Sequence, residues 1–193
     1  TQLGQELALD VFPRLASVEG IVLICTNEEA DFLARGLLDG LQAQGCEPAL
    51  VCFWNDRVSL SVDDARAPIV RRYVEQTKPA RTFLVVKSII SSSCVVRTNI
   101  SELVYDLNPA DIFVLAPVVL KGAQGRLESE FEPGIAARFK YAWFAEDDES
   151  KENGEVIPGV GGSVYELLGI GDSKSKNSFV PELVRERRKL LHR

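Results

Sequence analysis

Five short apolar runs, separated by segments with helical spacing, constrain this chain more than any other feature of its sequence. The runs cover 21–25, 49–54, 82–86, 112–119 and 139–144. The runs at 21–25 and 82–86 are continuous rather than alternating, which is typical of strands that are buried on both faces of a sheet. Strands that alternate with helices form parallel sheets covered by helices on both faces. We therefore predict an α/β fold with a mostly parallel five-strand sheet.

Helical segments are expected between and around these runs. Thr26 or Asn27 is placed to cap the helix that follows the first run, and Glu28 and Glu29 lie in its first turn, where carboxylates are favourable. Pro181 suits the first position of a last helix. The remaining helices are predicted over 3–16, over 69–76 within the polar stretch 55–79, and over 99–107.

Length and charge limit the class of protein. With 193 residues, 46% hydrophobic and 26% charged, the chain is expected to form one domain, 1–193, and not a disordered segment. A net charge of -6 argues against nucleic acid as a partner, and the basic run 185–189 is interpreted as a solvated helix end. No stretch approaches the ~18 apolar residues of a membrane span. We expect a cytoplasmic protein with reduced cysteines.

A ligand site of such a sheet is expected beyond the carboxyl ends of its strands. Three loops follow strand ends here, after Cys25, Val86 and Phe144. His192 is the one histidine of the chain, so a histidine base or a histidine-rich metal site is not expected. We assign no catalytic residue and no metal ligand.

Two of these loops carry sequence motifs. Residues 84–95 read Leu-Val-Val-Lys-Ser-Ile-Ile-Ser-Ser-Ser-Cys-Val, and residues 154–170 read Gly-Glu-Val-Ile-Pro-Gly-Val-Gly-Gly-Ser-Val-Tyr-Glu-Leu-Leu-Gly-Ile. In order and spacing they resemble the D-P-x-x-A-T-G-G-S and G-Y-I-V-P-G-L-G-D-A-G-D-R-x-F-G-T motifs of uracil phosphoribosyltransferases. The resemblance is continuous from about 81 to 169, whereas 21–57 match in pattern only.

The resemblance implies two groups of site residues. A phosphate would lie on the Ser-rich loop and the start of the helix after it, and a pyrimidine would be bound largely by main-chain groups of the second motif. It also implies a homodimer, a pyrimidine base or nucleotide as ligand, and no cofactor, with Mg²⁺ needed only if transferase activity survives. The phosphate-binding residues would be Lys87, Ser91, Ser92, Ser93, Cys94 and Val95, and the base-binding residues Val156, Ile157, Gly159 and Gly161.

The chain departs from the family in all three loops. Lys87 stands where the family has a ribose-binding Asp, and a lysine cannot accept the hydrogen bonds of the ribose hydroxyls. Glu28 stands where the family has a diphosphate-binding Arg, and Ser93-Cys94 replaces Gly-Gly. In the second motif Gly162 replaces a carboxylate, and Tyr165-Glu166 replaces an Asp-Arg pair.

These departures favour a degenerate transferase domain that binds a nucleobase, a nucleotide or a protein partner. Several alternatives remain open. The chain could be an active uracil phosphoribosyltransferase with an unusual site, an RNA-binding regulator, or a cysteine hydrolase that uses Cys94. Lys87 could contact a phosphate or be a solvated lysine, and Ser91, Ser92 and Ser93 could bind an anion weakly or form a turn that binds nothing.

Overall fold

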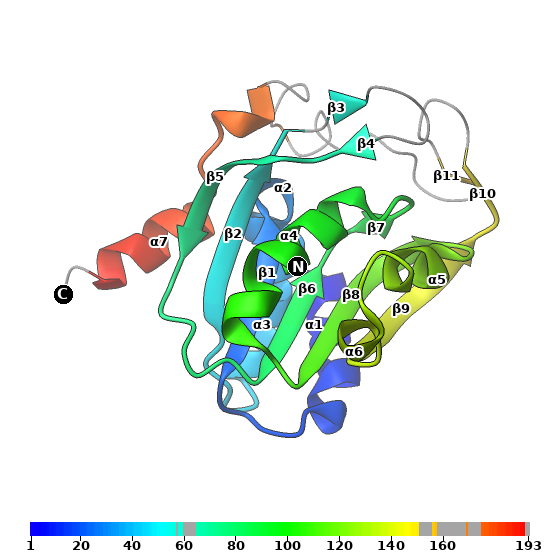
Figure 1. The fold of residues 1–193 in the computed structure, drawn as a ribbon. Coiled ribbons are helices and arrows are strands. Elements are labelled where there is room, and N and C mark those ends of the chain that lie inside the picture. The colour runs from blue at the N-terminus through cyan, green and yellow to red at the C-terminus, as the bar shows by residue number, and fades with distance from the viewer. Residues whose placement is uncertain (57, 60–64, 151–155, 158–168, 170–174, 192–193) are drawn as a thin grey trace.

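A computed structural model describes residues 1–56, 58–59, 65–150, 156–157, 169 and 175–191. The described elements alternate between helix and strand along most of the chain, as Figure 1 shows. The helices are α1 (Gln2–Val11), η1 (Phe12–Arg14), α2 (Asn27–Glu29), the π-helical η2 (Ala30–Ala34), α3 (Arg35–Gln42), α4 (Cys94–Leu107), α5 (Ala123–Glu128), α6 (Pro133–Ala136), η3 (Ser175–Asn177) and α7 (Glu182–Leu191). The strands are β1 (Ile21–Thr26), β2 (Ala49–Asn55), β3 (Val58–Ser59), β4 (Ala65–Arg66), β5 (Ile69–Val74), β6 (Thr82–Val86), β7 (Ile89–Ile90), β8 (Asp111–Leu120), β9 (Phe139–Asp147), β10 (Glu149–Ser150) and β11 (Val156–Ile157).

The predicted α/β fold is confirmed. The five predicted strands pair in parallel in the spatial order β2-β1-β6-β8-β9. The antiparallel β5 lies beside β2, and the short β7 pairs with the carboxyl half of β8, so the main sheet has seven described strands. All residues of β1 and β6 are buried, as their continuous apolar runs predict.

Helices cover both faces of this sheet and enclose two apolar cores. The core on one face is built from α1, η2, α3 and α7, and the core on the other from α4, α5 and α6. In Figure 1, α4 crosses in front of the sheet while α1 and α3 lie behind it. The largest buried side chains of the strands, Trp54, Phe53, Phe83 and Phe113, are fully enclosed between these layers.

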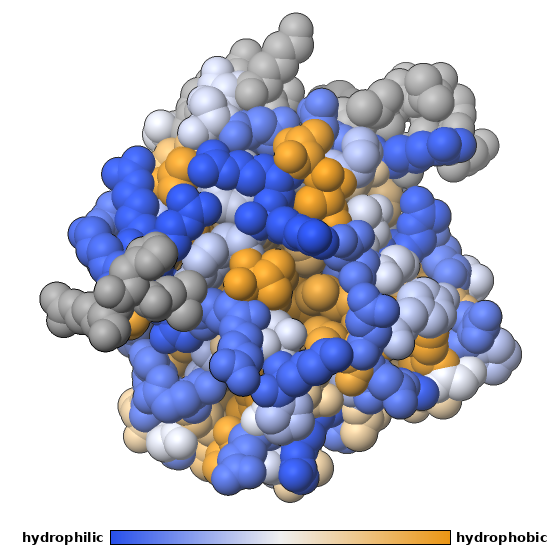
Figure 2. All heavy atoms as spheres, turned by 60° about the vertical axis from the view of Figure 1, so that its left-hand side comes forward, coloured by the Kyte–Doolittle hydropathy of each residue, from blue (hydrophilic) through white to orange (hydrophobic). Residues whose placement is uncertain are grey.

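The helix predicted over 69–76 is wrong, because Ile69–Val74 forms the edge strand β5. Ile69 and Tyr73 are four residues apart, which suits a helix, but the strand register places Tyr73 inside and Arg71 and Arg72 in solvent. Figure 2, which brings this side forward, shows mainly hydrophilic side chains with small apolar areas among them. Charged side chains on an edge strand hinder pairing with another chain.

Element ends also differ from the predicted ones. The helix expected over 99–107 already begins at Cys94, directly after the Ser-rich loop. β9 continues past Phe144 to Asp147, and α7 begins one residue after Pro181. None of these shifts moves the predicted loops away from the carboxyl ends of the strands.

α1 and α3 are in contact at backbone distance. A Cβ atom on Gly4 of α1 would lie 2.2 Å from the carbonyl oxygen of Leu33, and one on Gly40 of α3 would lie 2.6 Å from the Cβ of Ala8. Glycine at these positions therefore allows the two helices to pack closely over the sheet. This contact fixes the helical layer that follows the first loop.

Candidate functional site

The first and second predicted loops meet at the carboxyl edge of the sheet. β1 and β6 are parallel neighbours, so the residues that follow Thr26 and Val86 lie side by side. The first loop contributes Glu28 and Glu29, and the second contributes Lys87. The two positions at which the chain departs from the family with exchanged charge are therefore in direct contact.

An ion-pair cluster joins these residues. Lys87 Nζ lies 2.6 Å from Glu29 Oε1 and 3.2 Å from Glu28 Oε1. Lys176, from η3, adds a second ammonium group 3.9 Å from the same Glu28 oxygen. Two carboxylates thus face two ammonium groups, and we refer to Glu28, Glu29, Lys87 and Lys176 as the charge cluster.

The charge cluster is shielded from water. Glu28 and Glu29 are each 4% exposed, and Lys176 is 3% exposed, while the side chain of Lys87 is 17% exposed. The predicted position of Glu28 and Glu29 in the first turn of a helix is confirmed, but both carboxylates are buried. Lys87 is neither a solvated lysine nor free to contact a phosphate without losing its carboxylate partners. Buried charges are retained where partners of opposite charge compensate their desolvation.

Hydrogen bonds fix the cluster on both sides. Ser88 donates its backbone N–H (3.0 Å) and its hydroxyl (2.7 Å) to Glu29 Oε1. The side-chain amide of Asn27 donates to the carbonyl oxygen of Lys176 (2.6 Å), which ties η3 to the first loop. No side-chain cap was found at the start of α2, so the predicted capping role of Thr26 or Asn27 is not observed.

Three oxygens of the first loop are buried and have no hydrogen-bond partner among the residues that the structure describes. They are Thr26 Oγ1, Asn27 Oδ1 and Glu28 Oε2. Amide and carboxylate oxygens can only accept hydrogen bonds. These oxygens are enclosed by the protein, and those of Asn27 and Glu28 could be satisfied only by a hydrogen-bond donor.

The protonation of the cluster follows from its charges. Burial opposes ionisation of Glu28, but Lys87 and Lys176 outweigh it and hold the pKa of that carboxyl below its usual value. Burial likewise opposes the charge of Lys87, and Glu29 and Glu28 outweigh it, so the pKa of this ammonium is raised. Both groups are therefore ionised at neutral pH.

The Ser-rich loop precedes α4 as predicted, and a carboxylate of the chain occupies its end. The hydroxyl of Ser93 and the guanidinium of Arg97 both donate to Glu130. Ser92 Oγ lies 3.4 Å from Cys94 Sγ, and Arg126 donates to the carbonyl oxygen of Ser91. Val95 is half-buried in the first turn of α4. An anion at Ser93 would have to displace Glu130.

A shallow apolar pocket opens beside the charge cluster. It has a volume of about 300 Å³, and Glu28, Glu29 and Ser88 form one side of it. Leu3 of α1, Phe32 of η2 and Pro117 of β8 form the other. Leu3 and Phe32 are both exposed, so this edge of the molecule is apolar next to a neutralised ionic cluster.

The predicted base-binding segment is described only in part. Val156 and Ile157 form β11, which pairs in antiparallel orientation with β10. Gly159, Gly161, Gly162, Tyr165 and Glu166 lie outside the described residues. The base-binding prediction is therefore untested. Of the residues singled out from the sequence, the structure brings Lys87 together with Glu28 and Glu29.

Two contributors were not found from the sequence. Lys176 lies 148 positions from Glu28, and Glu130 lies 37 positions from Ser93, with no motif at either residue. The sequence did carry a signal for the contact between Glu28 and Lys87, because two simultaneous charge reversals in facing loops indicate a contact. This signal does not extend to Lys176 or Glu130.

Other sequence predictions are located as follows. All four cysteines are free and buried, including Cys94, and His192 lies outside the described residues. Within the described ranges, no helix is long and apolar enough to cross a membrane, and no group of three or more His, Cys, Asp or Glu is placed to hold a metal ion. The basic run is part of α7, where Arg187 is paired with Glu75.

Comparison with known proteins gives a result for the fold alone. No family model matches the chain, and no curated protein matches it in sequence. Among solved structures, the AQ2163 protein from Aquifex aeolicus is similar with a TM-score of 0.66 and 12% identity over 86% of this chain and 81% of that one. The hypoxanthine-guanine phosphoribosyltransferase of L. donovani is similar with a TM-score of 0.51 and 11% identity over 78% of this chain and 76% of that chain. This chain has a phosphoribosyltransferase-like fold.

A third similar structure is a hypoxanthine-guanine phosphoribosyltransferase from Bacillus anthracis, with a TM-score of 0.50 and 12% identity over 78% of this chain and 79% of that one. The named phosphoribosyltransferases in this comparison act on purines, and at these identities the likeness extends to the fold only. Within the phosphoribosyltransferase-like fold, the charge cluster lies at the carboxyl edge of the sheet, where parallel sheets bind their ligands.

Proposed function

We propose that this chain is a phosphoribosyltransferase-like domain that has lost transferase activity and binds a pyrimidine base or its monophosphate. The observation that carries this proposal is the buried contact of Lys87 with Glu28 and Glu29. A transferase of this kind must hold a sugar diphosphate with its Mg²⁺ at the carboxyl edge of the sheet. In this chain the same edge is filled by an ionic cluster that is complete without a ligand.

Electrostatics oppose the diphosphate substrate in particular. Phosphoribosyl pyrophosphate would bring several negative charges toward two buried carboxylates. Lys87 and Lys176 could bind it only by giving up Glu28 and Glu29, and breaking a buried ion pair costs about 3–5 kcal/mol. Mg²⁺ offsets part of the ligand charge, but the carboxylate that would meet the ribose hydroxyls is absent at position 87.

A bare base avoids these costs because uracil is neutral. The assignment to a pyrimidine depends on the resemblance of 154–170 to the uracil phosphoribosyltransferase motif, in which main-chain groups bind the base. Main-chain donors and acceptors do not depend on the side chains that have changed. We therefore expect uracil or uridine monophosphate to bind more tightly than phosphoribosyl pyrophosphate.

Isothermal titration calorimetry of the three ligands, each with and without Mg²⁺, tests this ranking. Binding of uracil or uridine monophosphate, together with no Mg²⁺-dependent binding of phosphoribosyl pyrophosphate, is the expected result. Ile157→Pro removes one main-chain donor of the second motif and should weaken binding of the base, whereas Ile157→Val keeps the donor and should not. Steady formation of uridine monophosphate from uracil and phosphoribosyl pyrophosphate would show that the domain is an active enzyme.

A further inference from the structure

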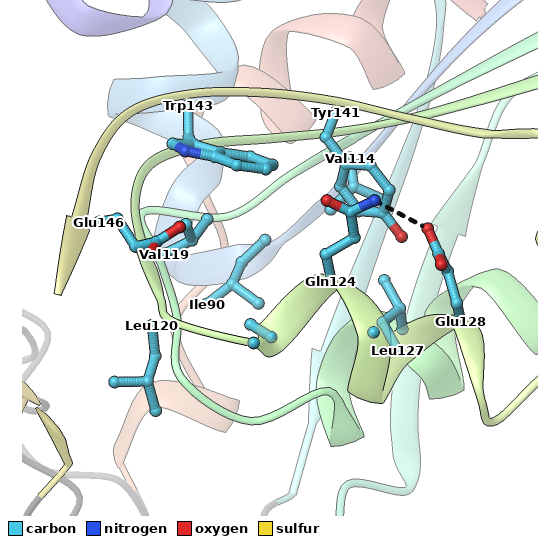
Figure 3. A pocket seen from close by; sticks show the side chains of 13 residues that line it. Ile90, Val114, Val119, Leu120, Gln124, Leu127, Glu128, Tyr141, Trp143 and Glu146 are labelled. Atoms are coloured by element: carbon cyan, nitrogen blue, oxygen red, sulfur yellow. Dashed lines mark hydrogen bonds between the residues drawn. The ribbon is translucent and has the colours of Figure 1, made fainter. Parts of the chain in front are cut away.

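A second pocket lies on the opposite side of β8 from the charge cluster. It has a volume of about 340 Å³ and is lined by residues of α5, β8, β9 and the turn before α5, together with Ile90 of β7. Figure 3 shows side chains from these elements pointing into one space. None of its lining residues belongs to the charge cluster or to the predicted phosphate- and base-binding sets. Its volume is within the range of small-molecule sites, roughly 300–1,000 Å³.

The walls of this pocket suit a flat ring. Tyr141 and Trp143 project from β9 with their ring centroids 5.9 Å apart and an interplanar angle of 64°. Ile90, Val119 and Leu127 supply an apolar surface that is continuous with the second core. Aromatic rings bind other rings and cations through their faces and edges. A planar group is therefore the best-fitting body of a ligand here.

The polar groups of the pocket have one sign of charge. Glu128 and Glu146 contribute two carboxylates, and none of the described residues that line the pocket is a lysine or an arginine. Gln124 Nε2 donates to Glu128 Oε1 at 3.1 Å, which orients this carboxylate toward the pocket (Figure 3). Beside it, the buried Tyr141 hydroxyl faces the same carboxylate (Figure 3). Burial, and then the nearby Glu128, raise the pKa of Tyr141, so its hydroxyl stays protonated.

We propose that this pocket binds a small aromatic molecule that carries a protonated amine. The ring would lie against Trp143 and Tyr141, and the ammonium group would donate to Glu128. This inference is independent of the proposed base binding, because a neutral base has no cation and a nucleotide is an anion. An anionic ligand of the same shape would meet two carboxylates and is excluded by the same charges.

A series of three ligands with one ring and different charge tests the proposal on the unmodified protein. Phenethylamine, 2-phenylethanol and phenylacetate are nearly the same size and are cationic, neutral and anionic at neutral pH. Because a phenyl ring does not absorb where tryptophan is selectively excited, a change in tryptophan emission reports binding. Trp143 lines the pocket and the buried Trp54 does not, and calorimetry confirms the affinities. A charge-assisted hydrogen bond makes phenethylamine bind about tenfold more tightly than 2-phenylethanol. Equal affinities, tighter phenylacetate binding or no binding of any of the three would overturn the proposal.

A matched pair of variants tests whether Glu128 is the carboxylate that binds the ammonium group. Glu128→Gln keeps the shape of the side chain and should remove the roughly tenfold preference for phenethylamine, with the affinity for 2-phenylethanol unchanged. Glu132→Gln is the same chemical change at an exposed residue that does not line the pocket, and it should leave both affinities unchanged. An unchanged preference in folded Glu128→Gln would overturn the assignment. If Glu128→Gln does not fold, the ligand series on the unmodified protein decides.

Discussion

Lys87 depends on two carboxylates in a part of the molecule that water hardly reaches. Its contacts with Glu29 at 2.6 Å and Glu28 at 3.2 Å offset the desolvation of three charges at once. Such a buried pair is not by itself a large source of stability, because desolvation consumes most of the Coulomb attraction. Removing one member is costly, however, because the others are left buried and unpaired.

Lys87→Met should therefore destabilise the fold by about 3–5 kcal/mol at neutral pH, as measured by urea unfolding. The double variant, Lys87→Met with Glu29→Gln, should lose less free energy of unfolding than the sum of the losses in the two single variants. Each single variant leaves the other member of the pair buried and charged, and the double variant removes both charges. Lys121→Met is the control, since Lys121 pairs with Asp148 at the surface and its side chain is 70% exposed. An equal loss in both lysine variants would contradict the assigned role of the cluster.

The same variants should differ in their response to pH. The folded-state pKa of Glu28 lies below its ordinary value of 4.5, so its stabilisation is fully present above that pH and is lost as the pH falls further. In Lys87→Met the buried carboxyl of Glu28 loses this partner and its pKa rises, so stability should instead increase as the pH is lowered from 7 toward 5. Urea unfolding at several pH values measures both trends, and parallel profiles would contradict the prediction.

At the scale of elements, two glycines in helices should respond in opposite directions to the same substitution. Gly4→Ala places a Cβ 2.2 Å from the Leu33 carbonyl oxygen and must push α1 away from the helix beneath it, at a cost of about 1–3 kcal/mol. Gly125→Ala meets no atom within 4 Å and should stabilise the protein by up to about 1 kcal/mol through helix propensity in α5. Thermal unfolding measures both, and equal shifts would show that α1 does not pack at backbone distance.

α7 is attached to the rest of the molecule by Asp31. The backbone N–H groups of Glu182 and Leu183 donate to the two carboxylate oxygens at 2.9 and 2.7 Å, so a residue of η2 caps a helix 151 positions away. Asp31→Ala should cost about 1–2 kcal/mol and increase hydrogen exchange in α7. Asp39→Ala, at an exposed position of α3, should change stability by less than about 0.5 kcal/mol. Unchanged exchange in α7 after Asp31→Ala would contradict the capping role.

The helices and strands show which parts of the fold could be predicted from the sequence. All five predicted strands are present, and the continuous apolar runs of β1 and β6 are buried throughout, whereas β9 is largely half-buried or exposed. β5 was misassigned because Ile69 and Tyr73 share helical spacing, whereas in the strand, which has an irregular register at Trp54/Asn55, Tyr73 lies in one core and Ile69 packs against the other. Lys176 carries no local signal for its contact with Glu28, because that contact exists only once η3 lies against the first loop.

At the scale of the whole molecule, the homodimer that the resemblance implies remains a prediction. Leu3 and Phe32 are 52% and 43% exposed and line the same shallow pocket, so they form an apolar area suited to a partner surface. Light scattering should give a dimer at tens of micromolar, and Leu3→Glu with Phe32→Glu should give a monomer. Val18→Glu, at a residue 47% exposed outside this pocket, should remain dimeric. A monomeric unmodified protein would reject the prediction.

The contact between the first two loops also determines how the fold would respond to single substitutions at positions 28 and 87. Lys87→Asp alone would restore the family's acidic residue but would gather three carboxylates around Lys176 in a buried space. Replacing Glu28 by Arg alone would set that cation beside Lys87 and Lys176 and leave Glu29 as the one carboxylate of the cluster for three cations. Each single step toward the family's pattern passes through a less stable protein, so reversal requires both loops to change together. Positions 28 and 87 are therefore coupled through folding, and a change of charge at one is tolerated only with the opposite change at the other.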